Sequence, residues 1–277
     1  MTTPIFIDSD NAMGARMGDV DDGFALAALL LSGLPIAALS SVAGNTSERQ
    51  AASDNRAIAR VCRTSPLLLR GEVRNRKRSE AAQFLIDSRE PVRVVALGPL
   101  TNVAAALSEI GQDQAGGKFE EVVIVGTDST SRGKWPPLWP HEFNLTYDGA
   151  AFRLLFESEV PLLIVPLDVC GTLRISRSDL DDVDGVLGEY LRENSRRWFR
   201  RCQILKWSGT VRLFDLVAAM VVIGSPGVAI ESTSAAMNAF GHVQFGVGRR
   251  PVRVVRRFDS TAMWQSFLTI VNSGSRQ

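Results

Sequence analysis

Five aspartates crowd into fifteen positions near the start of the chain. The stretch FIDSDNAMGARMGDVDDGFAL, residues 6–26, carries Asp8, Asp10, Asp19, Asp21 and Asp22 between two apolar runs. A helix N-terminus would stabilise each carboxylate by only about 0.3–1 kcal/mol, which does not offset their mutual repulsion. A hard cation bound by the carboxylate oxygens would offset this repulsion. The stretch contains no histidine or cysteine that would bind a softer metal. The pattern therefore predicts a calcium or magnesium site.

The elements that must position these carboxylates alternate between short apolar runs and helix-like stretches. The apolar runs are rich in Val, Ile and Leu and do not alternate with polar residues, which is typical of strands buried on both faces of a parallel sheet. The predicted strands are residues 4–8, 35–44, 66–70, 92–98, 121–126 and 161–168. The predicted helices between them are residues 23–33, 47–62, 80–89, 99–110 and 148–158, with Pro99 in a first turn and Asp148 as a cap.

This alternation predicts an α/β fold with one mostly parallel, doubly wound sheet. From about residue 176 the pattern turns helical, and a late strand at 250–258 and an amphipathic helix at 260–272 follow. With no internal repeat and no low-complexity linker, we expect one domain over residues 1–277, with the helical section over the carboxyl ends of the strands. Ligands of such sheets bind beyond those ends. Asp8 and Asp10 would lie there, beside Asp21 and Asp22 at the next helix start.

Composition narrows the class of protein further. A net charge of +1 gives no bulk electrostatic case for nucleic acid or membrane partners. The three cysteines are widely spaced, without zinc spacing or a disulfide framework, and favour a reduced, cytoplasmic protein. Neither a signal peptide nor a membrane span is expected. The basic strings at 74–78, 196–201 and 249–257 are interpreted as solvated faces or subunit contacts.

The order of several motifs resembles the nucleoside hydrolase family, of the inosine–uridine-preferring type. D-x-D at a strand end followed by Asp-Asp opening an apolar helix resembles that family's first signature, although ten residues separate Asp10 from Asp21 here. The further matching segments are VAGN (42–45), ALGPLTNVAAAL (96–107), HEFNLTYDGAA (141–151), PLDV (166–169) and LFDLVAAM (213–220). Asp215 within an apolar helix would be costly without a cationic partner.

The resemblance implies a role for each matching residue. The implied Ca²⁺ ligands are Asp10, Asp22, the backbone carbonyl of Thr101, and Asp215. Asp10 would also be the base that takes a proton from a water molecule. The implied ribose contacts are Asp21, Asn45, Glu142 and Asn144, with Asp8 orienting the ligands from behind. Asn45 is also an ordinary turn residue, Asn102 is read as structural, and Asp168 is either structural or part of the pocket wall.

The chain departs from the family where the base would leave. Phe214 stands where the inosine–uridine members usually carry a histidine, and the usual His-Gly loop over the active site is absent. Trp135 and Trp139, in a proline-rich segment, could stack on a purine ring or simply pack a lid, and Phe214 could join them. We therefore expect a substrate range that leans towards purines.

The resulting hypothesis is a calcium-dependent N-ribohydrolase that converts a ribonucleoside or related N-riboside to free base and ribose, working as a homodimer or homotetramer. A haloacid-dehalogenase-type phosphatase also places D-x-D after a first strand, but that motif requires Thr or Val where Ala12 stands. A relative that binds nucleosides or ribose without catalysis is the other alternative.

Overall fold

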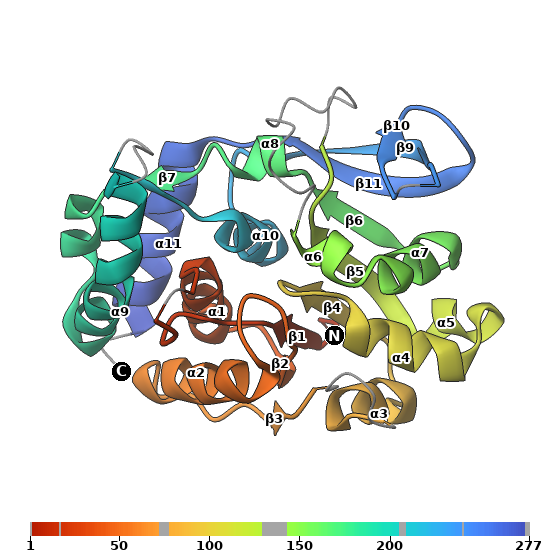
Figure 1. The fold of residues 1–277 in the computed structure, drawn as a ribbon, viewed down its shortest axis with the longest axis horizontal. Helices are drawn as coiled ribbons and strands as arrows, with labels where there is room; N and C mark the ends of the chain where they lie inside the picture. Colours follow the sequence, from red (N-terminus) through yellow and green to blue (C-terminus); the bar gives the residue numbers. More distant parts are fainter. Residues whose placement is uncertain are drawn as a thin grey trace.

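Nine strands among the described residues form one sheet, drawn with its helices in Figure 1. The computed structural model describes residues 2–16, 18–71, 78–128, 143–204, 209–239 and 241–274, with only the backbone at 112–114. The strand order is β10-β9-β11-β6-β5-β4-β1-β2-β3. The strands are β1 (Ile5–Ser9), β2 (Ile36–Ser41), β3 (Leu68–Leu69), β4 (Val92–Ala96), β5 (Phe119–Val125), β6 (Leu162–Val165), β9 (Ala229–Met237), β10 (Val243–Phe245) and β11 (Arg250–Arg257).

Neighbouring strands run parallel from β11 to β3, and β9 pairs antiparallel with both β10 and β11. A separate antiparallel ribbon joins β7 (Arg174–Ile175) to β8 (Val211–Arg212). The helices are α1 (Asp21–Leu31), α2 (Glu48–Val61), α3 (Glu80–Asp87), α4 (Thr101–Ile110), α5 (Gln112–Lys118), α6 (Phe143–Tyr147), α7 (Gly149–Glu157), α8 (Leu167–Cys170), α9 (Gly185–Ile204), α10 (Phe214–Ile223) and α11 (Ser260–Gly274), with a 3-10 turn, η1 (Ser178–Asp182).

Two hydrophobic cores lie on opposite faces of the sheet, which explains why the strands read as continuous apolar runs. Ile5 and Ile7 of β1 point into the core shared with α1, α2, α9, α10 and α11. Phe6, between them, points into the core shared with α3, α4 and α7. Because successive strand residues face opposite sides, both faces need apolar cover. The predicted doubly wound α/β fold is confirmed.

Several predicted boundaries were wrong at strand and helix ends. The strand predicted at 161–168 ends at Val165, because Pro166 caps the short helix α8, which contains Asp168. The helix predicted from Pro99 begins at Thr101. The prediction also lacked β9 and β10. Strand β9 lies near the edge of the sheet, and of its sequence AIESTSAAM only Ala235 is buried, so it carries no long apolar run to reveal it.

Two predicted helix starts are confirmed by their caps. The Ser47 hydroxyl accepts a hydrogen bond from the Gln50 N–H at the start of α2. The Asp148 carboxylate accepts one from the Ala151 N–H at the start of α7. None of the helices within the described ranges is long and apolar enough to cross a bilayer.

The C-terminal helix α11 closes one core through Phe267, which is fully buried against Phe24 and Trp264 with ring centroids 6.0 and 4.9 Å away. We expect Phe267→Ala to lower the free energy of unfolding by about 3–5 kcal/mol, because it leaves a cavity and removes buried apolar surface. Urea unfolding measures the change. Gln265→Ala, exposed on the same helix, should change stability by no more than about 0.5 kcal/mol, and similar losses in both variants would contradict the assignment.

Candidate active site

Asp8 and the residues around it tie the first two strands to helix α4. The Asp8 carboxylate accepts hydrogen bonds from the Ser40 hydroxyl at 2.6 Å and from Asn102 Nδ2 at 2.9 and 3.2 Å. Asn102 Nδ2 also donates to the Ser41 carbonyl at 3.1 Å. Burial raises the pKa of Asp8 to about 6 despite the hydrogen bonds that favour its charged form. Asp8 and Asn102 therefore join β1, β2 and α4, and the supporting role predicted for Asp8 at a bound ligand stays a prediction.

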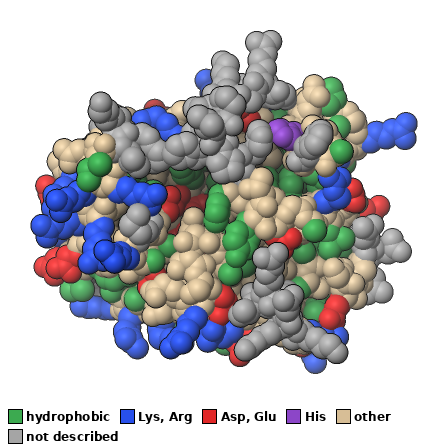
Figure 2. All heavy atoms as spheres, in the orientation of Figure 1, with side chains coloured by type: hydrophobic (Ala, Val, Ile, Leu, Met, Phe, Trp, Pro, Cys, Tyr) green, Lys and Arg blue, Asp and Glu red, His purple; other side chains and the backbone are tan. Residues whose placement is uncertain are grey.

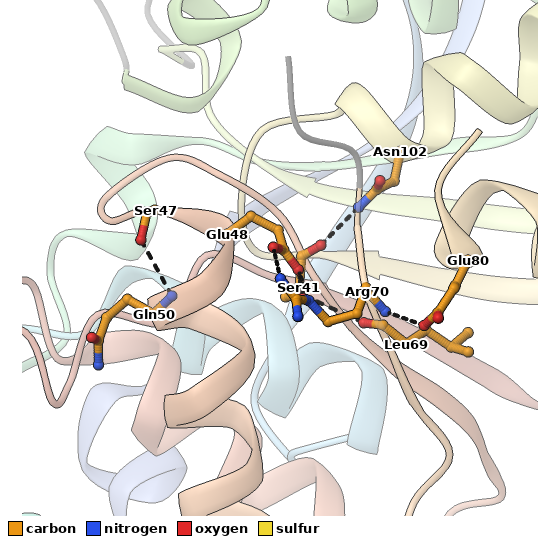
Figure 3. A network of polar contacts seen from close by, with 8 residues as sticks. All are labelled: Ser41, Ser47, Glu48, Gln50, Leu69, Arg70, Glu80 and Asn102. Carbon is orange, nitrogen blue, oxygen red and sulfur yellow. Dashed lines mark hydrogen bonds and ion pairs between the residues drawn. The ribbon is translucent and has the colours of Figure 1, made fainter. Parts of the chain in front are cut away.

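A polar network extends from Asn102 to the protein surface (Figure 3). The Ser41 hydroxyl donates to Glu48 at 2.7 Å, and Arg70 binds both oxygens of the same carboxylate. Burial alone would raise the pKa of Glu48, but the hydrogen bonds from Arg70 and Ser41 hold it below its usual value. The Arg70 N–H donates to Glu80 at 2.8 Å. This network fixes the carboxyl end of β2 against α2 and α3.

Asp10 lies just beyond β1 and is fully buried. Its Oδ2 accepts the Asn45 N–H at 2.5 Å, whereas its Oδ1 accepts no hydrogen bond from any residue that the structure describes. A Cβ at Gly44 would lie 2.0 Å from Asp10 Oδ2, and one at Gly98 would lie 3.0 Å from Asp10 Cγ. The glycines of the VAGN and ALG segments therefore allow two loops to close around this carboxylate.

Asp21, Asp22 and Asp215 bring three more carboxylates to the same place. One oxygen from each lies within 4.8 Å of the other two. The Ser9 hydroxyl holds Asp22 Oδ1 at 2.5 Å, and the Asp215 N–H donates to Asp21 Oδ2 at 3.3 Å. Asp22 Oδ2, like Asp10 Oδ1, has no hydrogen-bond partner within the described ranges. The starts of α1 and α10, far apart in the sequence, meet at this cluster.

Burial and mutual repulsion both oppose ionisation of these groups. Burial raises the pKa of Asp10 to about 7, and the charges of Asp21 and Asp19 add to the rise. Burial and the neighbouring aspartates also raise the pKa values of Asp22 and Asp215 well above the ordinary range. Such carboxylates ionise together at neutral pH only when a cation compensates. Oxygen atoms without hydrogen-bond partners, converging from separate elements, fit a divalent ion.

Asn45, Asn144, Thr101 and Phe214 are the other predicted residues that lie within the described ranges. Asn45 is exposed, so its side chain is accessible while its backbone holds Asp10. Asn144 Nδ2 donates to the Leu97 carbonyl at 2.7 Å, next to Gly98. Thr101 Oγ1 donates to Asp148 at 2.8 Å, and the role of its carbonyl stays a prediction. Phe214 is half-buried, and Glu142, Trp139, Trp135 and His141 lie outside the described residues.

Sequence reasoning gave no role to Ser9, Asp19 or Asp54. Ser9, between Asp8 and Asp10, was passed over because a serine there has no distinctive pattern. Asp19 belonged to the opening aspartate cluster, and burial followed by the charge of Asp21 raises its pKa. Asp54 on α2 accepts the Gly14 N–H at 3.1 Å and so anchors the segment between Asp10 and Asp21.

Of that segment the structure describes residues 11–16 and 18–20, and its two ends pack into the molecule. Asn11, Ala12, Met13 and Val20 are buried, and Met13 belongs to the core beside α1. The Met13 N–H donates to Asn11 Oδ1 at 3.1 Å, and a Cβ at Gly23 would meet the Met13 sulfur at 2.5 Å. Buried residues at both ends of the segment thus support the return of the chain to Asp21 and Asp22.

A doubly wound sheet with a cluster of carboxylates that could hold a metal ion defines the class of this α/β protein. The family model described as inosine-uridine preferring nucleoside hydrolase matches residues 5–265. The chain belongs to this family, and the resemblance drawn from its motifs is confirmed.

The relatives found by sequence include proteins named pyrimidine-specific ribonucleoside hydrolase RihA. The Klebsiella pneumoniae (strain 342) protein is 36% identical over 100 residues, covering 36% of this chain and 30% of its own. The Shewanella sp. (strain MR-4) protein is 32% identical over 105 residues, covering 38% and 31%. The matched region thus spans less than a third of either relative.

Solved structures share the whole fold at low sequence identity. A plant nucleoside hydrolase superposes with a TM-score of 0.82 at 20% identity, covering 98% of this chain and 99% of its own. A purine-preferring ribonucleoside hydrolase from Gardnerella vaginalis gives a TM-score of 0.82 at 18% identity and covers 99% of both chains. These likenesses establish the fold.

We expect Ca²⁺ to stabilise the protein through the carboxylate cluster. An ion at 100 times its dissociation constant would add about 2.7 kcal/mol to the free energy of unfolding. Asp215→Asn should lose this gain yet be no less stable than the native chain in chelator, because it removes one repelling charge. Thermal unfolding with Ca²⁺ or chelator checks this. Asp181→Asn, on the exposed turn η1, is the control, and an equal Ca²⁺ response in Asp215→Asn would contradict the site.

The raised carboxyl pKa values also predict how stability depends on pH. The pKa values of Asp8 and Asp10 rise from 3.8 to about 6 and about 7 on folding, so the folded chain binds more protons than the unfolded chain. In chelator, stability should therefore fall as the pH rises from about 4 to 7. Urea unfolding at several pH values measures it. The fall should be smaller in Asp10→Asn, and a rise across this interval would refute the explanation.

Proposed function

We propose that this chain is a calcium-dependent N-ribohydrolase that splits a ribonucleoside, or a related N-riboside, into free base and ribose. Family membership supports the reaction class. The observation that carries the proposal is the group of Asp21, Asp22 and Asp215, whose oxygens lie within 4.8 Å of one another, with the charge of the buried Asp10 acting on Asp22. Asp10 Oδ1 and Asp22 Oδ2 lack hydrogen-bond partners within the described ranges. Such oxygens are suited to an ion and to a ribose that reaches it.

The donor set favours Ca²⁺ over other metals. Asp10, Asp22, Asp215 and the Thr101 carbonyl would hold the ion, and Asp21 lies close enough to Asp22 and Asp215 to join them. Ca²⁺ accepts six to eight oxygen ligands in flexible geometry, which leaves positions for sugar hydroxyls, whereas Mg²⁺ requires a tighter octahedron. When bound, the ion would lower the pKa of a nearby water and neutralise part of the carboxylate charge.

Asp10 is suited to take the proton of the attacking water. Its Oδ2 is fixed by the Asn45 N–H, and its Oδ1 is left to accept a proton. A carboxylate fixed in this way beside a water molecule can act as its general base.

The remaining carboxylates would stabilise the sugar as its bond to the base breaks. Positive charge builds on the ribose ring in such reactions, and preorganised negative groups lower the energy of that state. Under our proposal Asp21, Asn45, Asn144 and Glu142 contact the ribose hydroxyls. Asp8 stays behind them, where its hydrogen bonds to Ser40 and Asn102 fix the surrounding loops.

The choice of base belongs to the proposal as well. The relatives include proteins named pyrimidine-specific and purine-preferring. We propose a preference for purines, supported by the aromatic Phe214 at the start of α10 and by Trp139.

We also propose a homodimer or homotetramer, which light scattering after size exclusion would test. Three buried cysteines outside any disulfide agree with the expected reducing cytoplasm.

The experiment that tests the function is ribose release from a panel of purine and pyrimidine ribonucleosides with Ca²⁺ present. We expect turnover of at least one nucleoside, and a loss of about 10²–10⁴-fold in kcat for Asp10→Asn, because a general base contributes that much. Circular dichroism should show that this variant folds.

Asp181→Asn serves as the matched control and should retain full turnover. Nucleoside binding without ribose release in the native chain would indicate a non-catalytic relative. Phosphate release from phosphoesters would indicate the phosphatase alternative. Unchanged turnover in Asp10→Asn would remove Asp10 as the base.

A further inference from the structure

Asp54 is a buried carboxylate on the core face of α2. Ile58, one turn further along the same face, is fully buried in the core beside α1. Asp54 Oδ2 accepts the Gly14 N–H at 3.1 Å, and its Oδ1 accepts Gln50 Nε2 at 2.9 Å. Both donors are neutral, and burial raises the pKa of Asp54 despite the two hydrogen bonds. The fold therefore buries this carboxylate at a cost, and its contact outside α2 is the backbone at Gly14.

The backbone at Gly14 approaches the Asp54 carboxylate very closely. A Cβ at Gly14 would overlap Asp54 Oδ1 and lie 3.0 Å from its Cγ. Because glycine has no Cβ, it allows this approach where another residue would collide. A hydrogen bond from an N–H to an ionised carboxylate is also stronger than one to a neutral oxygen. The two residues thus form a specific contact between positions forty apart in the chain.

Side-chain packing connects Gly14 to the carboxylate cluster. Its neighbour Met13 is buried and belongs to the core beside α1. A Cβ at Gly23 would meet the Met13 sulfur at 2.5 Å, so Met13 lies directly against the first turn of α1. Gly23 follows Asp22 in the chain. A shift of the backbone at Gly14 would therefore move a side chain that packs beside Asp22.

A series of hydrogen bonds makes the same connection. The Met13 N–H donates to Asn11 Oδ1 at 3.1 Å. The Asn11 N–H donates to the Ser9 hydroxyl oxygen at 3.2 Å, and the Ser9 hydroxyl donates to Asp22 Oδ1 at 2.5 Å. The other oxygen of Asp22 has no hydrogen-bond partner among the described residues. The path of the segment after Asp10 therefore sets the direction of a carboxylate with one oxygen available to an ion. Figure 2 shows how the described side chains cover the face seen in Figure 1.

The segment needs such a contact because it is long and joins groups that repel one another. Ten residues separate Asp10 from Asp21. The charge of Asp10 acts on Asp22, and oxygens of Asp21, Asp22 and Asp215 lie within 4.8 Å of one another. An ion that binds one arrangement of these groups has its apparent affinity lowered by the fraction of molecules that lack that arrangement. A contact to a helix of the core raises the fraction that has it.

We propose that Asp54 is a positioning residue of the cation site. By holding Gly14 it keeps the segment after Asp10 in the path that directs Asp22 at the ion. This assignment rests on the proposed function, and it adds a residue of α2 that acts through the backbone at Gly14 and not by contact with the ion.

The test measures Ca²⁺ affinity by isothermal titration calorimetry, and hydrogen exchange of the Gly14 amide by NMR in chelator. We expect Asp54→Ala to raise the Ca²⁺ dissociation constant by about 10–100-fold, the usual effect of removing a group that orients metal ligands from outside the coordination shell. The Gly14 amide should exchange faster in this variant than in the native chain, because its acceptor is gone. Asp54→Asn keeps a side-chain oxygen for Gly14 and should show a smaller rise in the dissociation constant.

Two variants of α2 are the controls. Ile58→Val loosens the packing of the same helix face, so it should lower the free energy of unfolding without changing the Ca²⁺ dissociation constant. Ser53→Ala, at the exposed neighbouring position, should change neither. If Asp54→Ala does not fold, Asp54→Asn decides.

An unchanged dissociation constant or unchanged Gly14 exchange in the Asp54 variant, or an equal rise of the constant in Ile58→Val, would overturn the assignment. If Ca²⁺ affinity depends on Asp54 as expected but the native chain releases no ribose from the nucleoside panel, the proposed function fails and the positioning role stands. A native chain that binds no Ca²⁺ would overturn both.

Discussion

The structure depends on one constraint, which is that several carboxylates are buried side by side without enough hydrogen bonds to satisfy them. Asp10 and Asp22 each keep one oxygen with no partner in the described part of the chain. Burying charge in this way costs several kcal/mol unless a cation compensates. The elements around the cluster hold these oxygens together against their repulsion. Asp10 follows strand β1, Asp21 and Asp22 lie at the start of α1, and Asp215 lies at the start of α10.

Neighbouring residues hold the carboxylates of the cluster in place through hydrogen bonds. Ser9 fixes one oxygen of Asp22, the Asn45 backbone fixes one oxygen of Asp10, and Asp8 fixes Asn102. From Asn102 the hydrogen bonds continue through Ser41 and Glu48 to Arg70, as Figure 3 shows. Because Asp10 and Asp22 each have one oxygen held by a protein hydrogen bond and one without a partner in the described ranges, their direction is fixed while one oxygen stays available to a ligand.

Under the proposed function, the negative charge of the cluster suits a ribose ring that becomes positive as its bond to the base breaks. Such preorganised fields are worth more in a buried site than in water, because the protein dipoles do not need to reorient.

The sequence by itself determined the fold class, the family and the aspartates that form the cluster. Strands without polar alternation require apolar cover on both faces, which indicated the fold class. The order of the motifs from Asp8 to Asp215 indicated the family. Only the tertiary structure decided how residues 11–20 pack, since the Asp54 contact to Gly14 spans forty positions and leaves no local pattern. The same holds for Ser9, for the backbone contact of Asn45, and for the pairing of Arg174 with Arg212. Local sequence reports periodicity and caps, whereas cross-chain hydrogen bonds and strand register arise only when distant segments pack together.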